Sequence, residues 1–456
     1  MNQSVPTSAP VAVRLAAFAA EAAPPPAARA VCRNLVFDIV GLAIAARETD
    51  YVAAALGSAV DEGPCTAFGH GRRLGVYDAA LVNGTAAHGE DYDDTFEGGP
   101  IHAGAVVVSA VLAIAERRGL DGRAVMRGIA VGTELMCRMS LVAPQATHKA
   151  GFHPTAIFGA PAAAAAVGAA LGLDGPTIAR ALGISGSLAS GIIEYLADGS
   201  STKRLHAGAA AVAGLRAALL AEGGFTGPVT VFDGTHGFYK AFAPSKPPNF
   251  APLVEGLGET WILETLAFKP YACGTMTQPF IDCALKLAAE GVKADDVVSI
   301  TCKVGEGTVH RLWEPLAEKH RPPNGYAGKF STPFCMAVGF IDGEAGLGQF
   351  TDERVKDPAV RALAAKISYE INPDDPYPRS FVGHLRAVLK DGTVHEFQQP
   401  HMRGGAHEPL SAEELAAKFK SNLRFGGFGD TDIAALSAAL AGLAEGGPVD
   451  LAAARL

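Results

Sequence analysis

Residues 155–171 have the sequence TAIFGAPAAAAAVGAAL, in which Ala and Gly fill most positions and the other side chains are almost all apolar. Small and apolar residues that recur at helical spacing predict a helix. Side chains this small also let neighbouring helix axes come close together. The stretch therefore predicts a closely packed helical body.

Similar segments on both sides extend this pattern, each bounded by Gly or Pro. Charged residues such as Glu116 and Arg118 occur where these segments end, as expected where helices meet solvent. A Pro-rich break at residues 243–252 ends the body. The further helices that we expect lie at 28–47, 104–118, 123–141, 176–190 and 202–222.

The pattern changes after this break. Residues 297–304 alternate as in a strand, and residues 385–397 contain Asp391-Gly392 between two β-rich runs, which predicts a hairpin turn. Helical segments at 277–290 and 331–342 lie between these strands. This part of the chain is therefore expected to form a smaller α/β domain.

The C-terminal part is expected to be helical again. Ser411 and Glu414 have the spacing of a capping box at the start of a helix, and a second helix is expected at 431–444. We therefore predict a mainly α protein with an α+β second domain. A large all-helical domain would comprise residues 1–265 and 398–456, and a smaller α/β lid domain residues 266–397.

Composition limits the functional classes. A chain of 456 residues exceeds the roughly 250–300 residues at which single cores stop growing, so two domains are expected. The net charge is −9 and the sequence contains no Lys/Arg-rich run, which argues against nucleic-acid and membrane-surface partners. The apolar run at residues 103–115 is too short to span a bilayer.

Seven cysteines without a Cys-x-x-Cys pair argue against a zinc ribbon, a disulfide scaffold and a simple iron–sulfur motif. Most of them are expected to be buried thiols. The N-terminus lacks the basic region of a signal peptide, so we expect a cytoplasmic protein.

The stretch from Asn83 to Thr95, together with His102, contains two imidazoles and four carboxylates in an Ala- and Gly-rich region. Such crowded carboxylates bind a cation, pair with His and Lys, or raise one another's pKa values toward neutrality. A solvated acidic turn is the alternative interpretation.

Other polar clusters occur where the chain changes direction. Ser201 or Thr202 is expected to cap the following helix, which places its first N–H groups beside Lys203. Lys203 and His206, three residues apart, share one helical face. The remaining clusters are His148–Thr155, Phe268–Tyr271 and Lys329–Ser331.

No dinucleotide-binding glycine motif, phosphate loop or nucleophile elbow is present, which lowers the expectation of redox, kinase and acyl-transfer chemistry. His and Lys together suit proton abstraction beside a carboxylate, because His can act as base and Lys can hold the charge that develops. Dehydration, epimerisation and decarboxylation are all open from such a site.

The ordered motifs Asn83–His102, Gly151–Pro154, Lys203–His206 and Lys269–Tyr271 together resemble the MmgE/PrpD family over nearly the whole chain. The resemblance implies a large helical domain with a smaller α/β lid, usually as a homodimer. Members of that family include dehydratases of the 2-methylcitrate type, decarboxylases and epimerases.

The resemblance also implies residue roles. His102 and His153 would act as base and acid, Lys203 and Lys269 would bind substrate carboxylates, and Asp91 with Thr95 would orient the substrate or a histidine. His206 and Tyr271 complete the expected substrate-binding set.

We therefore expect a lyase without cofactor or metal that acts on a small di- or tricarboxylic acid, with dehydration first and epimerisation or decarboxylation as alternatives. A metal-dependent hydrolase or hydratase with His88, Asp91, Asp93 and His102 as ligands is the rival hypothesis. A non-catalytic helical scaffold is the third.

Overall fold

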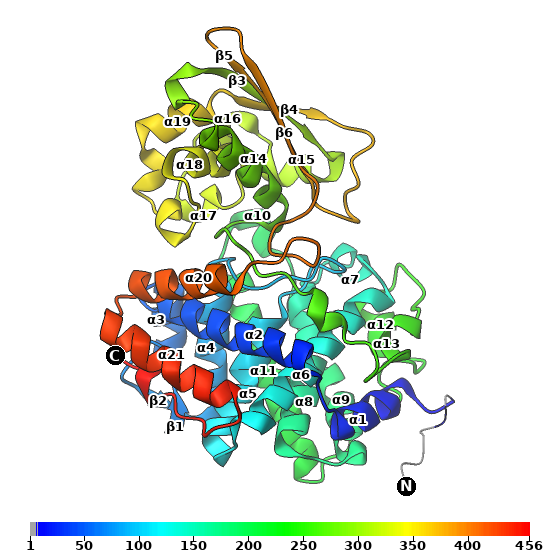
Figure 1. Ribbon diagram of the computed structural model, residues 1–456. Coiled ribbons are helices and arrows are strands. Elements are labelled where there is room, and N and C mark those ends of the chain that lie inside the picture. Colours follow the sequence, from blue (N-terminus) through cyan, green and yellow to red (C-terminus); the bar gives the residue numbers. More distant parts are fainter. Residues whose placement is uncertain (1–5, 7) are drawn as a thin grey trace. The chain divides into compact units, whose positions relative to one another are not determined.

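The computed structural model describes residue 6 and residues 8–456, which group into two compact units (Figure 1). The first comprises the described residues up to Gly89, Asp93–Leu266 and Leu415–Leu456. The second comprises Ala267–Glu414 and a detached segment of three residues, Glu90–Tyr92. This short segment belongs to the second unit although the residues on both sides of it belong to the first.

Helix α8 (Pro154–Leu171) forms the centre of the first unit, and every residue from Pro154 to Ala170 is buried. It packs against α5 (Ala103–Arg118), α6 (Gly122–Val142), α9 (Gly175–Leu188) and α11 (Thr202–Glu222) (Figure 1). The helical body predicted from residues 155–171 is thus confirmed. The helix continues through Pro161.

Close helix packing depends on glycine where α4 (Val76–Gly89) meets α11. A Cβ atom added at Gly84 would lie 2.7 Å from the Cα of Gly208, and one added at Gly208 would overlap the carbonyl oxygen of Leu81. No larger residue fits at this crossing without moving the backbone. The contact brings the C-terminal turn of α4 close to the first turns of α11.

The other helices of this unit are shorter or lie at its edge: α1 (Val11–Glu21), α2 (Pro26–Ala45), α3 (Asp50–Gly57), α7 (Ala146–Lys149), α10 (Tyr195–Asp198), α12 (Phe238–Phe242) and α13 (Ala251–Val254). The unit also contains a two-stranded antiparallel sheet of β1 (Glu62–Thr66) and β2 (Arg73–Leu74). An all-helical domain was therefore too strict an expectation. These strands are too short to show an alternating pattern.

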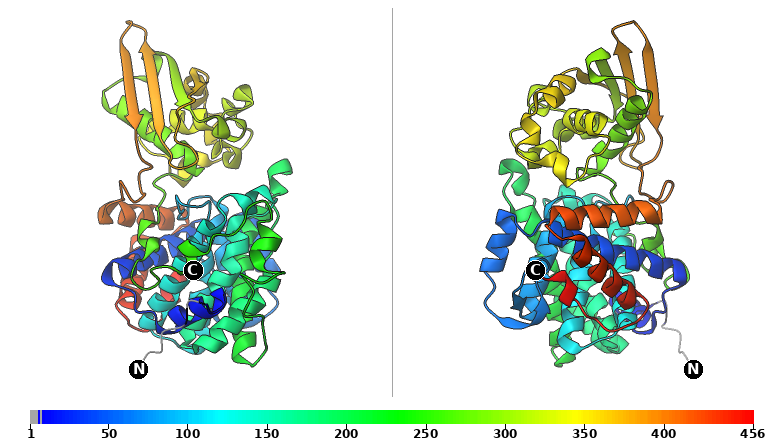
Figure 2. Two further views of the ribbon diagram at one scale, coloured as in Figure 1. Left: turned by 90° about the vertical axis from the view of Figure 1, so that its right-hand side faces the viewer. Right: turned by 60° about the vertical axis from the view of Figure 1, so that its left-hand side comes forward.

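The second unit contains a four-stranded sheet in the order β4-β3-β5-β6, formed by β3 (Val297–Val304), β4 (Ile367–Ile371), β5 (Gly383–Leu389) and β6 (Val394–Gln399). β4 pairs parallel to β3 and the other pairs are antiparallel. Helix α14 (Gln278–Ala289) packs against β5 and β6 and also against α18 (Thr332–Asp342) (Figure 2).

The predicted strand at 297–304 and the predicted hairpin are confirmed. Gly392 adopts a left-handed φ of 88° in the turn between β5 and β6, a conformation that favours glycine. Strand β4 was not predicted, although its five residues, ISYEI, alternate between apolar or aromatic and polar side chains.

The capping box at Ser411 is also confirmed. The Ser411 N–H donates to Glu414 Oε2 at 2.8 Å, and the Glu414 N–H donates to Ser411 Oγ at 3.2 Å, at the start of α20 (Ala412–Phe425). From Leu415 the chain lies in the first unit, where Phe419 packs edge-on against Phe37 of α2 with ring centroids 5.0 Å apart. Helix α21 (Asp430–Ala444) follows.

Two helices, α8 and α11, have the length and apolar composition of a membrane span, and their most apolar windows are 94% and 56% buried inside the protein. Such burial is the ordinary situation of core helices, so they are weak evidence for a membrane span. All seven cysteines lie in the described part of the chain as free, buried thiols, as predicted.

Candidate active site

Four histidines gather inside the first unit. The ring centroid of His88 lies 5.1 Å from that of His102 and 5.7 Å from that of His153, and His153 lies 5.2 Å from His206. All four are at most 9% exposed. Segments more than 100 residues apart in the sequence thus form one buried group, which we call the imidazole cluster.

Three helix N-termini meet at this cluster. His102 directly precedes α5, His153 directly precedes α8, and His206 lies in the second turn of α11. These three helices pack against one another, which holds their N-terminal ends together. The His102 N–H donates to Thr155 Oγ1 of α8 at 3.2 Å. Because helix N-termini carry partial positive charge, this arrangement favours bound anions.

The Asp94 carboxyl caps the start of α5. Its two carboxylate oxygens accept from the N–H groups of Ala103 and Gly104 at 3.0 and 2.9 Å. Burial and, next, the charge of Asp93 raise the Asp94 pKa to about 8, against the lowering effect of these two hydrogen bonds. The Asp94 carboxyl therefore anchors the helix that follows His102 and titrates near neutral pH.

The tautomer of His102 follows from its partner. His102 Nδ1 lies 2.7 Å from the carbonyl oxygen of Asp94, which can only accept a hydrogen bond, so Nδ1 carries a proton. In the neutral imidazole the basic lone pair is then on Nε2. His102 thus has the form of a potential base.

His153 and His206 are joined through their ring nitrogens, with Nδ1 to Nδ1 at 3.1 Å. One of these nitrogens must donate and the other accept, so the pair cannot be protonated at both positions. Burial, followed by the charges of neighbouring histidines and Lys203, keeps the His153 pKa well below its usual range. Burial, His88 and Lys203 lower the His206 pKa to about 4. Both rings are therefore neutral at pH 7.

The four carboxylates between Glu90 and Asp94 divide between the two units. In the first unit, Asp93 Oδ2 lies 2.7 Å from His88 Nδ1. In the second, Lys269 Nζ donates to Asp91 Oδ1 at 2.8 Å and Lys329 Nζ to Glu90 Oε2 at 2.7 Å. Since Asp91, Asp93 and Asp94 are at most 3% exposed, the solvated acidic turn is wrong for them.

Each lysine of the second unit also binds the main chain. Lys269 Nζ donates to the carbonyl oxygen of Asp91 at 2.9 Å, and Lys329 Nζ to that of Glu90 at 2.7 Å. The Tyr92 hydroxyl donates to the Pro270 carbonyl at 2.9 Å. We call Glu90–Tyr92 with Lys269 and Lys329 the lysine clamp. Asp91 has a left-handed φ of 56° in it, a conformation that Asp tolerates better than most residues.

Tyr271 lies in the same unit and binds a carboxylate. Its hydroxyl donates to Asp282 Oδ1 at 2.5 Å, and it is 4% exposed. Burial raises the pKa of Asp282 to about 6, and burial also raises the Tyr271 pKa above its ordinary value. Tyr271 thus combines a core position with a polar partner.

The structure brings together part of the predicted site. His102, His153 and His206 lie in the imidazole cluster, and the charge of Lys203 acts on two of them. Thr95 is buried in the same unit, one residue after Asp94. Asp91, Lys269 and Tyr271 lie in the second unit.

Sequence reasoning missed two rings of the cluster. His88 was noted in the crowded stretch and as a possible metal ligand but was not among the predicted catalytic residues, and Tyr195, with its ring centroid 6.1 Å from His153 and 5.8 Å from His206, was not predicted at all. The available signal for His88 was its position on a helix, α4, which had not been recognised.

The metal-ligand set of the rival hypothesis is not assembled. Asp91 lies in the second unit and binds Lys269, whereas His88, Asp93 and His102 lie in the first. Within residue 6 and residues 8–456, no group of three or more His, Cys, Asp or Glu side chains is arranged to hold a metal ion.

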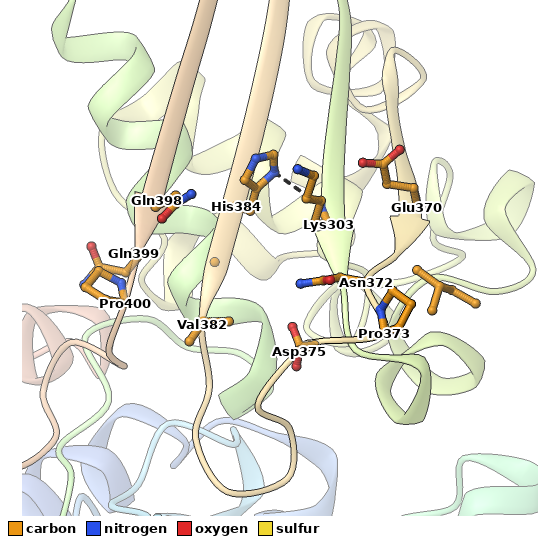
Figure 3. A pocket seen from close by; sticks show the side chains of 12 residues that line it. Lys303, Glu370, Asn372, Pro373, Asp375, Val382, His384, Gln398, Gln399 and Pro400 are labelled. Carbon is orange, nitrogen blue, oxygen red and sulfur yellow. Dashed lines mark hydrogen bonds between the residues drawn. The ribbon is translucent and has the colours of Figure 1, made fainter.

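The second unit has a cavity of about 520 Å³ beside its sheet, at the ends of β3, β4, β5 and β6 (Figure 3). It contains none of the predicted site residues. His384, which lines it, is engaged on both sides: Nδ1 accepts from the Lys303 N–H at 3.4 Å and Nε2 lies 2.8 Å from Glu396 Oε1. We place the candidate site at the imidazole cluster, where the groups that can exchange protons are.

The fold and the ordered site motifs define a known class. The chain belongs to the MmgE/PrpD family: the MmgE/PrpD N-terminal domain matches residues 13–251 and the MmgE/PrpD C-terminal domain matches residues 271–437. The family predicted from the sequence is confirmed.

Among curated proteins the chain is similar to cis-aconitate decarboxylases. That of Aspergillus terreus (strain NIH 2624 / FGSC A1156) is 28% identical over 384 residues, covering 79% of this chain and 77% of the relative. Those of Mus musculus and Homo sapiens are 28% and 29% identical, each over 75% of this chain and over 71% and 72% of the relative. These comparisons support a lyase, and they do not single out the dehydratase expected first.

Proposed function

We propose that this protein is a cofactor-independent carboxy-lyase that acts on a small tricarboxylic acid of the cis-aconitate type. The observation that carries the proposal is the imidazole cluster, in which His102, His153 and His206 are buried at the starts of three helices and Lys203 acts on His153 and His206, both of which are neutral. The similarity to cis-aconitate decarboxylases supports decarboxylation over dehydration and epimerisation.

Decarboxylation makes two demands on a site. The substrate carboxylates must be bound, and the electron pair left on carbon when carbon dioxide departs must receive a proton. Lys203 and the positive ends of α8 and α11 suit the first demand, whereas the first N–H groups of α5 already bind Asp94. An imidazolium suits the second: it gives its proton to carbon and returns to the neutral imidazole, while the carboxylate leaves as carbon dioxide.

The neutral state of the empty site fits this order of events. Burial and the charge of Lys203 hold His153 and His206 unprotonated without substrate. A polyanionic substrate placed beside them reverses the local potential and raises their pKa values. Substrate binding should therefore be accompanied by uptake of about one proton, which loads the acid that the reaction consumes.

Three residues of the second unit, Asp91, Lys269 and Tyr271, were predicted to orient or bind the substrate. The contacts of Lys269 change the role that we propose for it. Lys269 binds Asp91 through its side chain and its carbonyl, so we assign it first to holding Asp91 in place. The orienting role of Asp91 and the substrate-binding role of Tyr271, which the family resemblance implies, stay predictions.

The test is conversion of cis-aconitate, citrate, 2-methylcitrate and amino-dicarboxylates by the purified protein in D₂O, followed by NMR, with and without EDTA. We expect loss of one carboxyl carbon as carbon dioxide from cis-aconitate, incorporation of one deuteron, and no effect of EDTA. Water loss from citrate or 2-methylcitrate would establish a dehydratase instead, and inversion at carbon an epimerase. Absence of turnover and of deuterium exchange with every substrate would overturn the proposal.

Calorimetric titration with a non-reacting tricarboxylate, in buffers of different ionisation enthalpy, measures the proton uptake separately. Uptake near one proton at pH 7 is the expected result, and none would contradict the assigned loading of the acid. The homodimer and the cytoplasmic location remain predictions. Light scattering of the purified protein would give its molar mass and so test the homodimer.

A further inference from the structure

His88 and Asp93 form a dyad with a feature that the proposed mechanism does not use. His88 is 1% exposed and lies in the last turn of α4, with Nδ1 2.7 Å from Asp93 Oδ2. Its other ring nitrogen, Nε2, is buried and has no hydrogen-bond partner among the residues described. A buried polar atom left in this way is uncommon and requires a reason.

The dyad touches both imidazoles to which the proposed function assigns proton transfer. The His88 ring stacks on His153 at an interplanar angle of 29° and is tilted by 54° against His102. Asp93 Oδ1, the oxygen not bonded to His88, lies 3.7 Å from His102 Nδ1. One carboxylate and one ring therefore contact two residues that lie 51 positions apart in the sequence.

We propose that the Asp93–His88 dyad is a positioning element of the active site, which fixes the His102 and His153 rings and controls how readily they gain a proton. The kinetic part of this inference rests on the proposed function, whereas the titration part does not. His88 acts through its neighbours and is not assigned contact with substrate.

The physical basis is orientation and charge. Asp93 can hold a proton on His88 Nδ1, as the carboxylate does in other carboxylate–histidine pairs. The His88 ring is stacked on His153, and its electrostatic influence is the largest lowering effect on the His153 pKa after burial. The titratable and charged groups around the dyad are Asp94, His102, His153, Lys203 and His206, with Tyr51 and Arg204 beside the neighbouring Gly89 and Asp38 acting on Asp94.

The experiment compares His88→Gln and Asp93→Asn with the matched control His384→Gln. His384 is also a buried histidine, 8% exposed, paired with a carboxylate at 2.8 Å, but it lies on β5 of the second unit. The side-chain NMR signals of ¹³C-labelled histidines are titrated in each folded, full-length variant.

In His88→Gln the pKa of His153 should rise, because the lowering influence of His88 is removed. Asp93→Asn keeps an acceptor for His88 Nδ1 but removes the carboxylate charge beside the His88 and His102 rings, so the His153 titration should change there too. His384→Gln should leave it unchanged. An unchanged His153 titration in either folded cluster variant would overturn the proposal, and Asp93→Asn decides alone if His88→Gln fails to fold.

Kinetics supply the second readout. We expect kcat on cis-aconitate to fall about 10- to 100-fold in His88→Gln, as for loss of other supporting groups behind a reacting residue, with KM within twofold. A purely structural role would leave kcat and its pH profile unchanged in the folded variant, and this result would overturn the inference. If no substrate is turned over by the wild type, the proposed function fails while the titration still decides the dyad's role.

Discussion

The imidazole cluster of the first unit and the lysine clamp of the second neutralise carboxylates from the same five residues, Glu90 to Asp94, in different ways. Asp93 is paired with a histidine and Asp94 with helix N–H groups, whereas Asp91 and Glu90 are paired with lysines. An imidazole gains or loses a proton near neutral pH, but a lysine beside a carboxylate stays charged. The difference separates a region suited to proton transfer from a region suited to holding the chain in place.

The largest expected effect is on catalysis in the cluster. His153→Gln removes a proposed acid or base while keeping a polar side chain of similar size, and kcat should fall by about 10²- to 10⁴-fold. The control is His70→Gln, in the turn between β1 and β2 of the same unit. Steady-state decarboxylation assays measure both variants. A wild-type kcat in the His153 variant would contradict the assignment of proton transfer to the imidazole cluster.

The next effect is on stability in the clamp. Lys269→Met leaves the Asp91 carboxylate, at 5% side-chain exposure, without its counter-charge and should cost about 3–5 kcal/mol. Lys329→Met should cost less, because the Glu90 side chain is 19% exposed and can be hydrated. The double variant Lys269→Met/Asp91→Asn should recover part of the loss.

Denaturant unfolding in a Trp261→Phe background measures these effects, because Trp313 of the second unit is then the remaining tryptophan. If both lysine variants lose the same free energy of unfolding, or if Lys269→Met loses less than about 1 kcal/mol, burial of the carboxylate does not determine the strength of these ion pairs.

The pH dependence of stability gives a smaller effect with a defined sign. The His206 pKa is lowered to about 4 in the folded protein, from an ordinary value of 6.5, so the unfolded chain binds the proton more readily. Its contribution to stability is therefore complete above pH 6.5 and is lost as the pH falls toward 4. His206→Gln should flatten the fall in stability across this window, measured by denaturant unfolding at each pH. An equally steep fall in the variant would contradict the lowered pKa.

The smallest expected effect is at an exposed helix cap, which serves as a reference for the strength of the buried lysine clamp. Ser411→Ala removes the hydroxyl that accepts from the Glu414 N–H at the start of α20. The free energy of unfolding should fall by about 1 kcal/mol. Ser411→Asp, which can still cap, should cost less. A loss as large as that of Lys269→Met would mean that the clamp is no stronger than a helix cap.

Much of the fold was predictable because it depends on short-range patterns. Helices α5, α8 and α11 begin and end within a residue of their predicted limits, and β3 matches residues 297–304. Their signals are hydrophobic spacing and terminal Gly, Pro or capping residues. Helix α4 was not among the predicted helices, and its polar Asn83 and His88 are both buried.

Most residues of the candidate site could be predicted from the sequence, but the contacts between them could not. His102, His153 and His206 were identified from motifs. The contact of His153 with His206, however, joins two residues that lie 53 positions apart on different helices. Lys269 was expected to bind substrate, and the structure shows it bound to Asp91, 178 residues away. No local pattern encodes such distances.

By itself, then, the sequence determined the helices, the hairpin, the family and the residues capable of proton chemistry, because these follow from local spacing and side-chain type. Only the tertiary structure decided which carboxylate meets which cation, that His88 stacks on His153, and that buried imidazoles stay neutral. The physical reason is that the energy of a charge depends on its burial and on its neighbours within a few ångströms. Both are set by packing between distant segments.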